Sequence, residues 1–240
     1  MNKYHQEILL EIKEVSETNS KNTGWEHAGK YMGTTKTIHN ITNPQTHAIA
    51  KNWARQHKNL TVSELSEILN AFFAGQSHNE RSFGGKLLGY YPKLQCQLKP
   101  VLLDKWLNGA EGWGEVDSIC QNVFQAKEML EDWKDWEKWL RTWSKDKNVH
   151  KRRASLVLLT GPVVYSNDQR LFDLAFENID QLMGEKDILI TKAVSWLLRS
   201  IVRRHPELVK DYLAKNENSL PKIAVRETRN KLKSGRKSGK

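Results

Sequence analysis

The sequence has 240 residues, of which 38% are hydrophobic, and this size suits one large domain or one short repeat array. The formal net charge is +10, but the segment 222–240 holds eight basic residues and one acid and therefore carries most of that charge. No apolar run approaches the roughly 18 residues of a transmembrane helix, and no apolar segment follows Met1, so we expect neither a membrane span nor a signal peptide. The two cysteines form no CxxC pair, and the expected location is the cytoplasm.

Apolar residues recur with helical periodicity along most of the chain, and strand-like alternation is rare, which predicts an all-α protein. The first stripe is Ile8, Leu9, Ile12 and Val15. Pro44 after Asn43 predicts a helix over 44–57, because proline suits the first turn behind a capping residue. A capping box at 61–64 predicts the next helix, with core positions up to Phe72. Further helices are expected over 79–91, 99–107, 113–125, 133–145, 148–159, 168–182, 187–203, 206–214 and 219–232, with breaks at Pro92, Gly112, Gly161, Pro162, Gly184 and Pro206.

A dozen or so helices joined by short turns predict an α-solenoid of antiparallel helix pairs. Its concave, basic face would suit a rod-like partner such as duplex DNA. We expect a single domain over residues 1–232, followed by a basic, disordered tail over 233–240. An irregular globular bundle is the competing architecture, because the helix pairs show little direct sequence similarity to one another.

Four tryptophans lie three or four residues apart between positions 133 and 143: Trp133, Trp136, Trp139 and Trp143. With Leu140 beside them they form one apolar helix face, while the charged residues between them form the opposite face. This stripe predicts core packing rather than a binding site.

Trp113 and Asp117 lie four residues apart and share one face of a predicted helix. An indole face beside a carboxylate can hold a cationic or electron-poor group, since both attract positive charge. Asp117 also lies beside the apolar positions of the same helix, where an unpaired carboxylate would be costly. Two interpretations of Asp117 therefore remain: a catalytic acid, or a structural acid that caps a helix or is buried with a partner.

Two later segments add basic and aromatic residues. Arg152 and Arg153 fall in the first turns of a predicted helix, where positive charge opposes the helix dipole and an anion would compensate it. Trp196 and Arg199 lie three residues apart on one face of another predicted helix. The alternatives are a tolerated surface charge in the first case, and a core tryptophan beside an arginine that reaches solvent in the second.

The pattern resembles the DNA alkylation repair enzymes of the AlkD type, which are monofunctional DNA glycosylases built from HEAT-like helical repeats. The residues that carry the resemblance are Trp113 and Asp117 in Trp-x-x-Val-Asp-Ser-Ile, Arg153 before an alanine, and Trp196 in Lys-Ala-x-x-Trp-x-Leu-Arg. Tyr31, in Lys-Tyr-Met-Gly-Thr, is similar to the family's N-terminal DNA-facing segment. The resemblance covers about residues 25–232 and departs from the family at His150, where tryptophan is common.

The resemblance implies excision of positively charged N-alkylated purines, such as 7-methylguanine and 3-methyladenine, from duplex DNA by a monomeric enzyme of base excision repair. It implies that Asp117 stabilises an oxocarbenium-like sugar and directs the attacking water. Trp113 and Trp196 would be catalytic partners that pack on the lesion. Arg153, Arg152, Arg199 and Tyr31 would contact DNA.

Other classes of site have no motif in this sequence. The eight histidines lack metal-ligand spacing, and no glycine-rich phosphate loop occurs, so we expect neither a metal nor a cofactor. Two competing functions stay open: a non-catalytic HEAT-like protein that binds bent or branched DNA, and a helical scaffold for other proteins. Asp117 favours catalysis over simple binding, because an acid repels phosphates.

Overall fold

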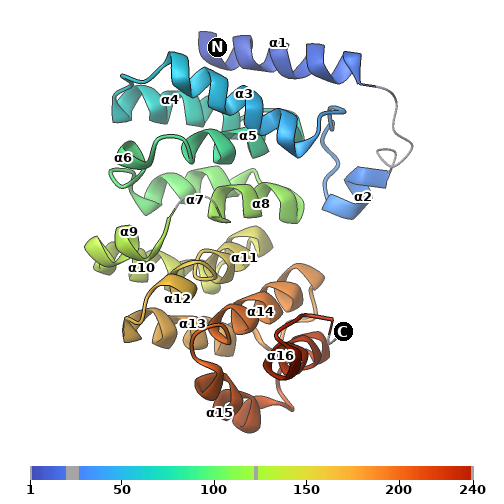
Figure 1. The fold of residues 1–240 in the computed structure, drawn as a ribbon, viewed down its shortest axis with the longest axis vertical. Helices are drawn as coiled ribbons and strands as arrows, with labels where there is room; N and C mark the ends of the chain where they lie inside the picture. Colours follow the sequence, from blue (N-terminus) through green and yellow to red (C-terminus); the bar gives the residue numbers. More distant parts are fainter. Residues whose placement is uncertain (1, 20–26, 122–123, 239–240) are drawn as a thin grey trace. The chain divides into compact units, whose positions relative to one another are not determined.

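The computed structural model describes residues 2–19, 27–121 and 124–238. Within these ranges every regular element is a helix (Figure 1). The one β-bridge in them is an isolated contact between Thr37 and Ser77. The chain divides into two compact units, Met1–Val123 and Phe124–Lys240. None of the helices in the described ranges has the length and apolar character needed to cross a bilayer.

Unit 1 contains eight helices in its described part. They are α1 (Lys3–Thr18), α2 (Ala28–Met32), α3 (Asn43–Gln56), α4 (Val62–Phe73), α5 (His78–Leu88), α6 (Pro92–Gln95), α7 (Pro100–Asn108) and α8 (Gly112–Gln121).

Unit 2 also contains eight helices in the residues described. They are α9 (Ala126–Glu131), α10 (Trp133–Ser144), α11 (Val149–Val157), α12 (Pro162–Tyr165), α13 (Gln169–Leu182), α14 (Ile188–Ile201), α15 (Pro206–Asn216) and α16 (Lys222–Ser234).

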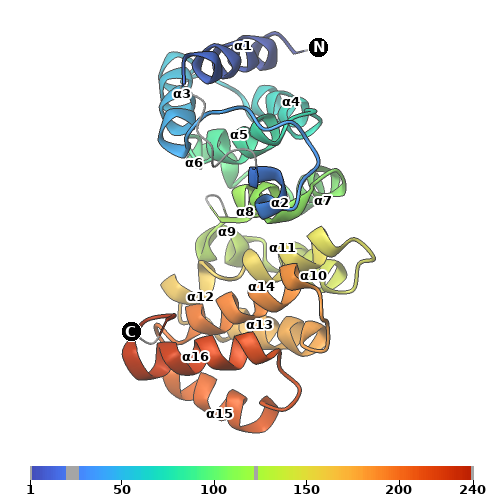
Figure 2. The same ribbon diagram turned by 90° about the vertical axis from the view of Figure 1, so that its right-hand side faces the viewer.

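Helices that are distant in sequence pack in series within each unit, which is the arrangement of an α-solenoid. In unit 1, α5 packs against both α3 and α8. In unit 2, α14 packs against both α11 and α16, and Figure 2 shows α16 lying along α14. The expected all-α, solenoid-type fold is therefore confirmed, whereas its concave basic face stays a prediction.

Local capping explains where several helices of unit 1 begin. Thr61 and Glu64 form the predicted capping box of α4, and Thr42 with Gln45 forms another at α3, one residue earlier than expected. Ser77 and Glu80 cap α5, and Glu80 also accepts a hydrogen bond from His5 of α1 at 2.8 Å. The first turn of α5 is thereby fixed to the N-terminal helix.

The tryptophan stripe of α10 packs as expected. Trp136, Leu140 and Trp143 are fully buried, so the core prediction is confirmed for them. Trp133 and Trp139 are half-buried at the margin. The guanidinium of Arg170 lies 5.4 Å from the Trp133 ring centroid, as in a cation–π contact.

Some predicted boundaries differ from the observed ones. The helix expected over 113–125 is described from Gly112 to Gln121, while residues 122 and 123 lie outside the described ranges. Where a tail was expected from residue 233, α16 continues to Ser234 and the chain folds back, so that Lys237 Nζ lies 3.3 Å from Glu227 Oε1. Residues 239 and 240 of that tail lie outside the described ranges.

Candidate active site

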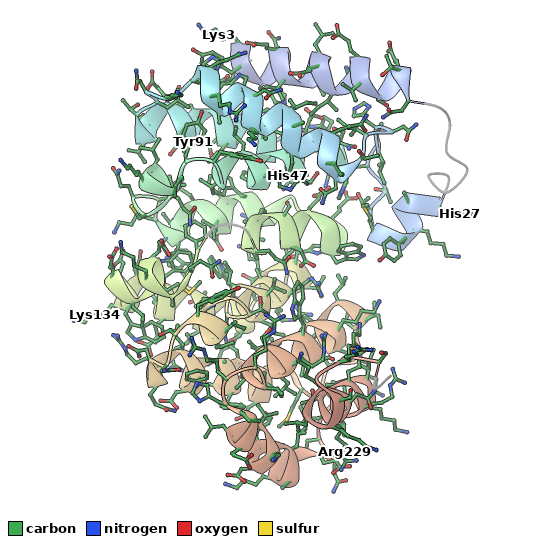
Figure 3. All side chains as sticks on the ribbon, viewed as in Figure 1. Lys3, His27, His47, Tyr91, Lys134 and Arg229 are labelled. Atoms are coloured by element: carbon green, nitrogen blue, oxygen red, sulfur yellow. The ribbon has the colours of Figure 1, made fainter. Side chains whose placement is uncertain are left out.

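A cavity of about 400 Å³ lies within unit 1, and Trp113 and Asp117 both line it. We call it the Asp117 cavity. The other lining residues are Met32, Ile38, Ile41, Asn43, Thr46, His47, His78, Asn79, Ser82, Lys86, Gly114, Ser118 and Gln121. Figure 3 labels His47 on α3, the helix that forms one wall. The indole and the carboxylate that the sequence placed on one helix face thus line the same cavity.

A direct contact between the backbones of α5 and α8 lies beside the cavity, which Ser118 lines. Gly85 of α5 lies against the Ser118 carbonyl of α8, and a side chain at position 85 would overlap that carbonyl. Only glycine permits this approach. Residues next to the crossing on either helix, including Asp117 and Lys86, therefore reach the same cavity.

The short helix α2 packs on the N-terminal end of α8 and brings Tyr31 to Trp113. Gly112 has φ +66°, and a side chain there would overlap the Met32 carbonyl. The Trp113 indole Nε1–H donates to the Tyr31 carbonyl at 2.8 Å, and the two rings meet edge to face with centroids 5.3 Å apart. Tyr31 itself is 71% exposed. Trp113 is therefore held in a fixed orientation at the cavity edge.

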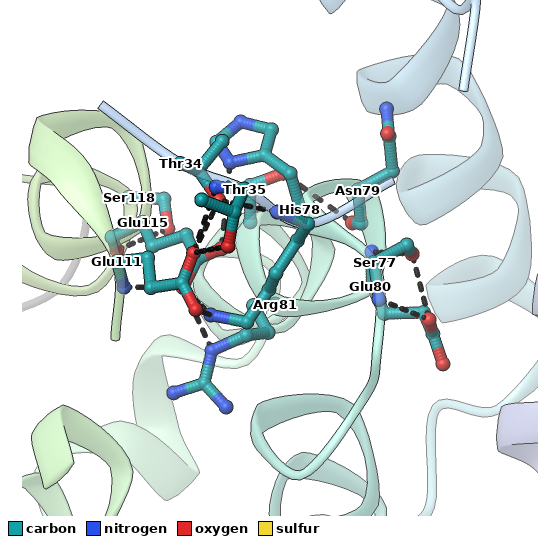
Figure 4. Close-up of polar contacts among 12 residues, drawn as sticks. Thr34, Thr35, Ser77, His78, Asn79, Glu80, Arg81, Glu111, Glu115 and Ser118 are labelled. Atoms are coloured by element: carbon teal, nitrogen blue, oxygen red, sulfur yellow. Dashed lines mark hydrogen bonds and ion pairs between the residues drawn. The ribbon is translucent and has the colours of Figure 1, made fainter. Parts of the chain in front are cut away.

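Glu111, just before α8, fixes the segment that follows α2. Its Oε2 accepts the Thr35 backbone N–H at 2.9 Å and the hydroxyls of Thr34 and Thr35 at 3.0 and 3.1 Å (Figure 4). The bond from the Thr35 N–H is the main reason that the pKa of Glu111 falls to about 2. This carboxylate stays ionised and keeps α2 docked.

Glu115 is the centre of a buried ionic cluster, which we call the Glu115 cluster. Its carboxylate is fully buried, and Oε2 lies 2.8 Å from Arg81 Nε and 3.1 Å from Lys36 Nζ. Oε2 also accepts the Glu111 backbone N–H at 2.9 Å. His78 Nδ1 lies 3.6 Å from the other oxygen. Figure 4 shows how α5 and the loop before α8 converge on this carboxylate.

Electrostatics in the Glu115 cluster follow from burial and pairing. Burial raises the pKa of Glu115, but the contact with His78 and the hydrogen bonds from Glu111 and Lys36 outweigh it and hold the pKa below its ordinary value. Burial lowers the pKa of Arg81, and Glu115 opposes that shift. Arg81 also donates through Nη2 to the Trp106 carbonyl at 2.7 Å and through Nη1 to the Phe73 carbonyl. The cluster thus joins α4, α5, α7 and α8, and its member His78 also lines the cavity.

Unit 2 holds the other predicted site residues. Arg153 on α11 is buried, and its Nη1 donates to the Leu189 carbonyl of α14 at 2.6 Å. Trp196 is half-buried on α14, seven residues after Leu189 and hence on the same helix face. The structure therefore brings Arg153 to the helix that carries Trp196.

The two remaining arginines are held by acids of unit 2. Arg152 pairs with Glu185 through Nε at 2.7 Å and Nη2 at 3.1 Å, and its Nη1 donates to two backbone carbonyls. Arg199 Nε lies 3.5 Å from Glu227 Oε2, which also accepts the Ser195 hydroxyl at 2.6 Å. A contact with DNA stays a prediction for both, and for Arg152 it requires that the guanidinium leave Glu185.

Sequence reasoning gave no role to Glu115 or Lys86, although Glu115 lies inside the motif that was singled out. Glu115 lies four residues before Ile119, an expected core residue, and residues four apart share one face of a helix. The spacing therefore placed this acid on the buried face of the helix. That signal could have identified a buried, paired carboxylate. Lys86 gave no such signal, because its place in the cavity depends on the contact between Gly85 and Ser118.

Taken together, the fold and the cavity define an all-α, solenoid-type protein with a tryptophan–aspartate site in its N-terminal unit. The sequence matches the family model described as DNA alkylation repair enzyme over residues 12–232, and the chain belongs to that family. The family's function implies that the chain binds DNA. Among curated proteins, none matches this chain.

A solved structure described as a predicted DNA alkylation repair enzyme from Enterococcus faecalis has a similar fold. The TM-score is 0.71, with 17% sequence identity, over 87% of this chain and 95% of that chain. At this identity the likeness supports the helical architecture alone.

Proposed function

We propose that this protein is a DNA glycosylase that excises positively charged N-alkylated purines, of the 7-methylguanine and 3-methyladenine type, from duplex DNA during base excision repair. Family membership supplies the repair context. The observation that carries the proposal is that Trp113 and Asp117, from successive turns of α8, line one cavity. No metal or cofactor is part of the proposed reaction, and the enzyme acts as a monomer.

Asp117 is the proposed catalytic residue. Alkylation of a ring nitrogen makes the purine cationic and therefore a good leaving group, so the enzyme mainly has to stabilise the sugar as positive charge develops on it. Asp117 is half-buried in the wall of the cavity, and its carboxylate attracts that charge more strongly there than it would in water. The same carboxylate can orient or deprotonate the water that attacks the sugar.

Trp113 supplies the aromatic wall of the proposed site. Its indole face attracts a cationic base or sugar through cation–π interaction. The hydrogen bond to the Tyr31 carbonyl holds the ring before substrate arrives, which lowers the entropic cost of positioning. Tyr31, exposed beside it, is proposed to contact DNA.

Residues of unit 2 are proposed to bind DNA independently of that chemistry. Arg153 would hold a backbone phosphate, since a planar guanidinium suits phosphate oxygens. Trp196 would offer a stacking surface for a nucleotide, and Arg199 on the same helix face would add positive charge. Arg152 would contribute charge only after release from Glu185.

The experiment uses a duplex with a single 7-methylguanine and measures strand cleavage by alkali at the abasic site that excision leaves. We expect excision by the wild-type protein, and loss of excision in Asp117→Asn with duplex binding retained. Asp211→Asn, which changes an exposed acid on α15, is the matched control and should leave excision unchanged. Excision at the wild-type rate by Asp117→Asn contradicts the assigned role.

The alternative functions predict other outcomes. A non-catalytic protein for bent or branched DNA would bind duplexes without releasing any base. A protein scaffold would show no steep loss of DNA affinity with rising salt, whereas phosphate contacts by several cations produce one.

A further inference from the structure

Lys86 is a cavity residue that the proposed excision does not use. It lies on α5, where positions 78, 79, 82 and 86 form one stripe along the wall of the Asp117 cavity. Its side chain makes no hydrogen bond or ion pair with any other residue that the structure describes. Partial burial of an ammonium group without an ionic partner lowers the stability of the folded protein. A purely structural role would therefore not explain a lysine at this position.

The α5–α8 crossing places Lys86 near the proposed catalytic acid. Gly85 and Ser118 are in backbone contact, and Lys86 and Asp117 are their direct neighbours in sequence. Both side chains line the same cavity, and Asp117 is the one acid among its described lining residues. An amine and a carboxylate thus line the same cavity.

Burial shifts the amine towards its neutral, nucleophilic form, although the charged form still predominates at pH 7. Burial lowers the pKa of Lys86 from 10.5 to about 8, so that about a tenth of the molecules carry the free amine at pH 7. The other titratable groups at the cavity are His47 on α3, His78 on α5 and Asp117 on α8. Burial and then the nearby Lys86 charge lower the pKa of His47.

We propose that Lys86 is a nucleophile that forms an imine with the aldehyde of an abasic deoxyribose, and that the Asp117 cavity thereby carries a second activity, cleavage of the DNA strand by β-elimination. The proposal rests on the proposed function in one respect, because the abasic sugar is the product of base excision. A monofunctional glycosylase stops at that sugar, whereas this chain would process it further.

The chemistry balances without an oxidant or a reductant. The neutral Lys86 nitrogen adds to the C1′ carbonyl of the ring-opened sugar, and uptake of one proton from solvent with loss of one water gives a protonated imine. A base, for which Asp117 is placed, then removes a C2′ proton, and that electron pair forms the C2′–C3′ double bond while the C3′–O bond breaks. The leaving group is the 5′-phosphate of the downstream strand. Water hydrolyses the remaining imine and regenerates the amine.

The test supplies a duplex with a ready-made abasic site, together with sodium borohydride. The reagent reduces the imine to a stable amine, so that protein and DNA become covalently joined and migrate together on a denaturing gel. We expect this adduct with the wild-type protein, and a tryptic peptide that carries the reduced sugar on Lys86. Lys86→Arg should lower adduct yield by about tenfold or more, because a guanidinium stays protonated and is a poor nucleophile.

Lys51→Arg, the same change at an exposed position of α3, is the matched control and should leave the yield unchanged. Absence of an adduct with the wild-type protein, or an adduct that maps to another amine, overturns the proposal. Non-covalent binding of the duplex is measured without borohydride. If Lys86→Arg binds as tightly as the wild type, its lower adduct yield does not result from weaker DNA affinity. If binding falls in parallel with adduct and no peptide carries the sugar on Lys86, the residue is a phosphate contact and the proposal is wrong.

The outcome is separable from that of the proposed function. Excision of 7-methylguanine is measured by cleavage with alkali and does not require Lys86. The abasic duplex needs no excision. Either activity can therefore fail while the other is observed.

Discussion

The Glu115 cluster provides a quantitative prediction about stability. Glu115→Gln removes the buried negative charge and leaves Arg81 in a site where 4% of it is exposed. Removal of one partner from a buried ion pair typically costs about 3–5 kcal/mol, because the other charge stays buried without compensation. We expect a loss of this size, since Lys36 also loses its contact with Glu115 at 3.1 Å and keeps only Glu111, at 3.6 Å, as an acidic partner.

The assay is urea unfolding at pH 7 followed by far-UV circular dichroism, with each unit fitted as its own transition if two transitions appear. The matched control is Glu131→Gln on α9, where the pair with Lys127 spans 3.9 Å and both side chains are exposed. Exposed pairs contribute about 0–1 kcal/mol, so this control should unfold almost as the wild type does.

A double variant separates the ionic effect from a general packing defect. Arg81→Met combined with Glu115→Gln removes both charges at the 2.8 Å contact, so it should be less destabilised than the sum of the single variants by about 1 kcal/mol or more. A loss below about 1 kcal/mol for Glu115→Gln would refute the reasoning, because it would mean that water reaches the cluster and screens it. Strict additivity would refute the direct Arg81–Glu115 interaction.

Three further predictions concern the backbone, pH and salt. Gly112→Ala should destabilise the protein by about 1–3 kcal/mol in the same urea assay, because φ is +66° and α2 lies in the way; Gly184→Ala, where a Cβ meets no atom within 4 Å, should be nearly neutral. The pKa values of Glu80 and Glu111 are both lowered from 4.5 to about 2. Their contribution to stability is thus complete above pH 4.5 and is lost as the pH falls towards 2, which acid titration of the melting temperature would show and a flat profile would contradict. Duplex affinity should fall linearly on a log–log plot against salt concentration, and a salt-independent affinity would argue against phosphate contacts.

Regular helices were predictable because the apolar period and the caps agree locally. The capping box at Thr61 and Glu64 gave α4 directly. Pro92 and Pro162 were predicted as breaks, but each stands in the first turn of a short helix, α6 and α12, where proline needs no backbone hydrogen bond. A four-residue helix has too few positions to show an apolar period.

The site was predictable only where it lies on one helix. Trp113 and Asp117 share the cavity because the helical repeat places them on the same face of α8. The partners of Glu115 come from α5 and from the segment after α2, so they depend on tertiary contacts that no local pattern encodes. Lys86 enters the cavity for the same reason.

The fold-back at the C-terminus changes how the charge of this protein should be counted. Glu227 is a counterion shared by Arg199 and Lys237, one from α14 and one from the final segment. If Arg199 moved to a phosphate, Lys237 would remain beside Glu227. The buried Glu227 carboxylate would therefore keep a positive partner and would not be left unpaired near the phosphates. Part of the positive charge at the C-terminal end is therefore used within the protein to neutralise Glu227. The number of basic residues in this segment is larger than the number of phosphates that the segment can neutralise.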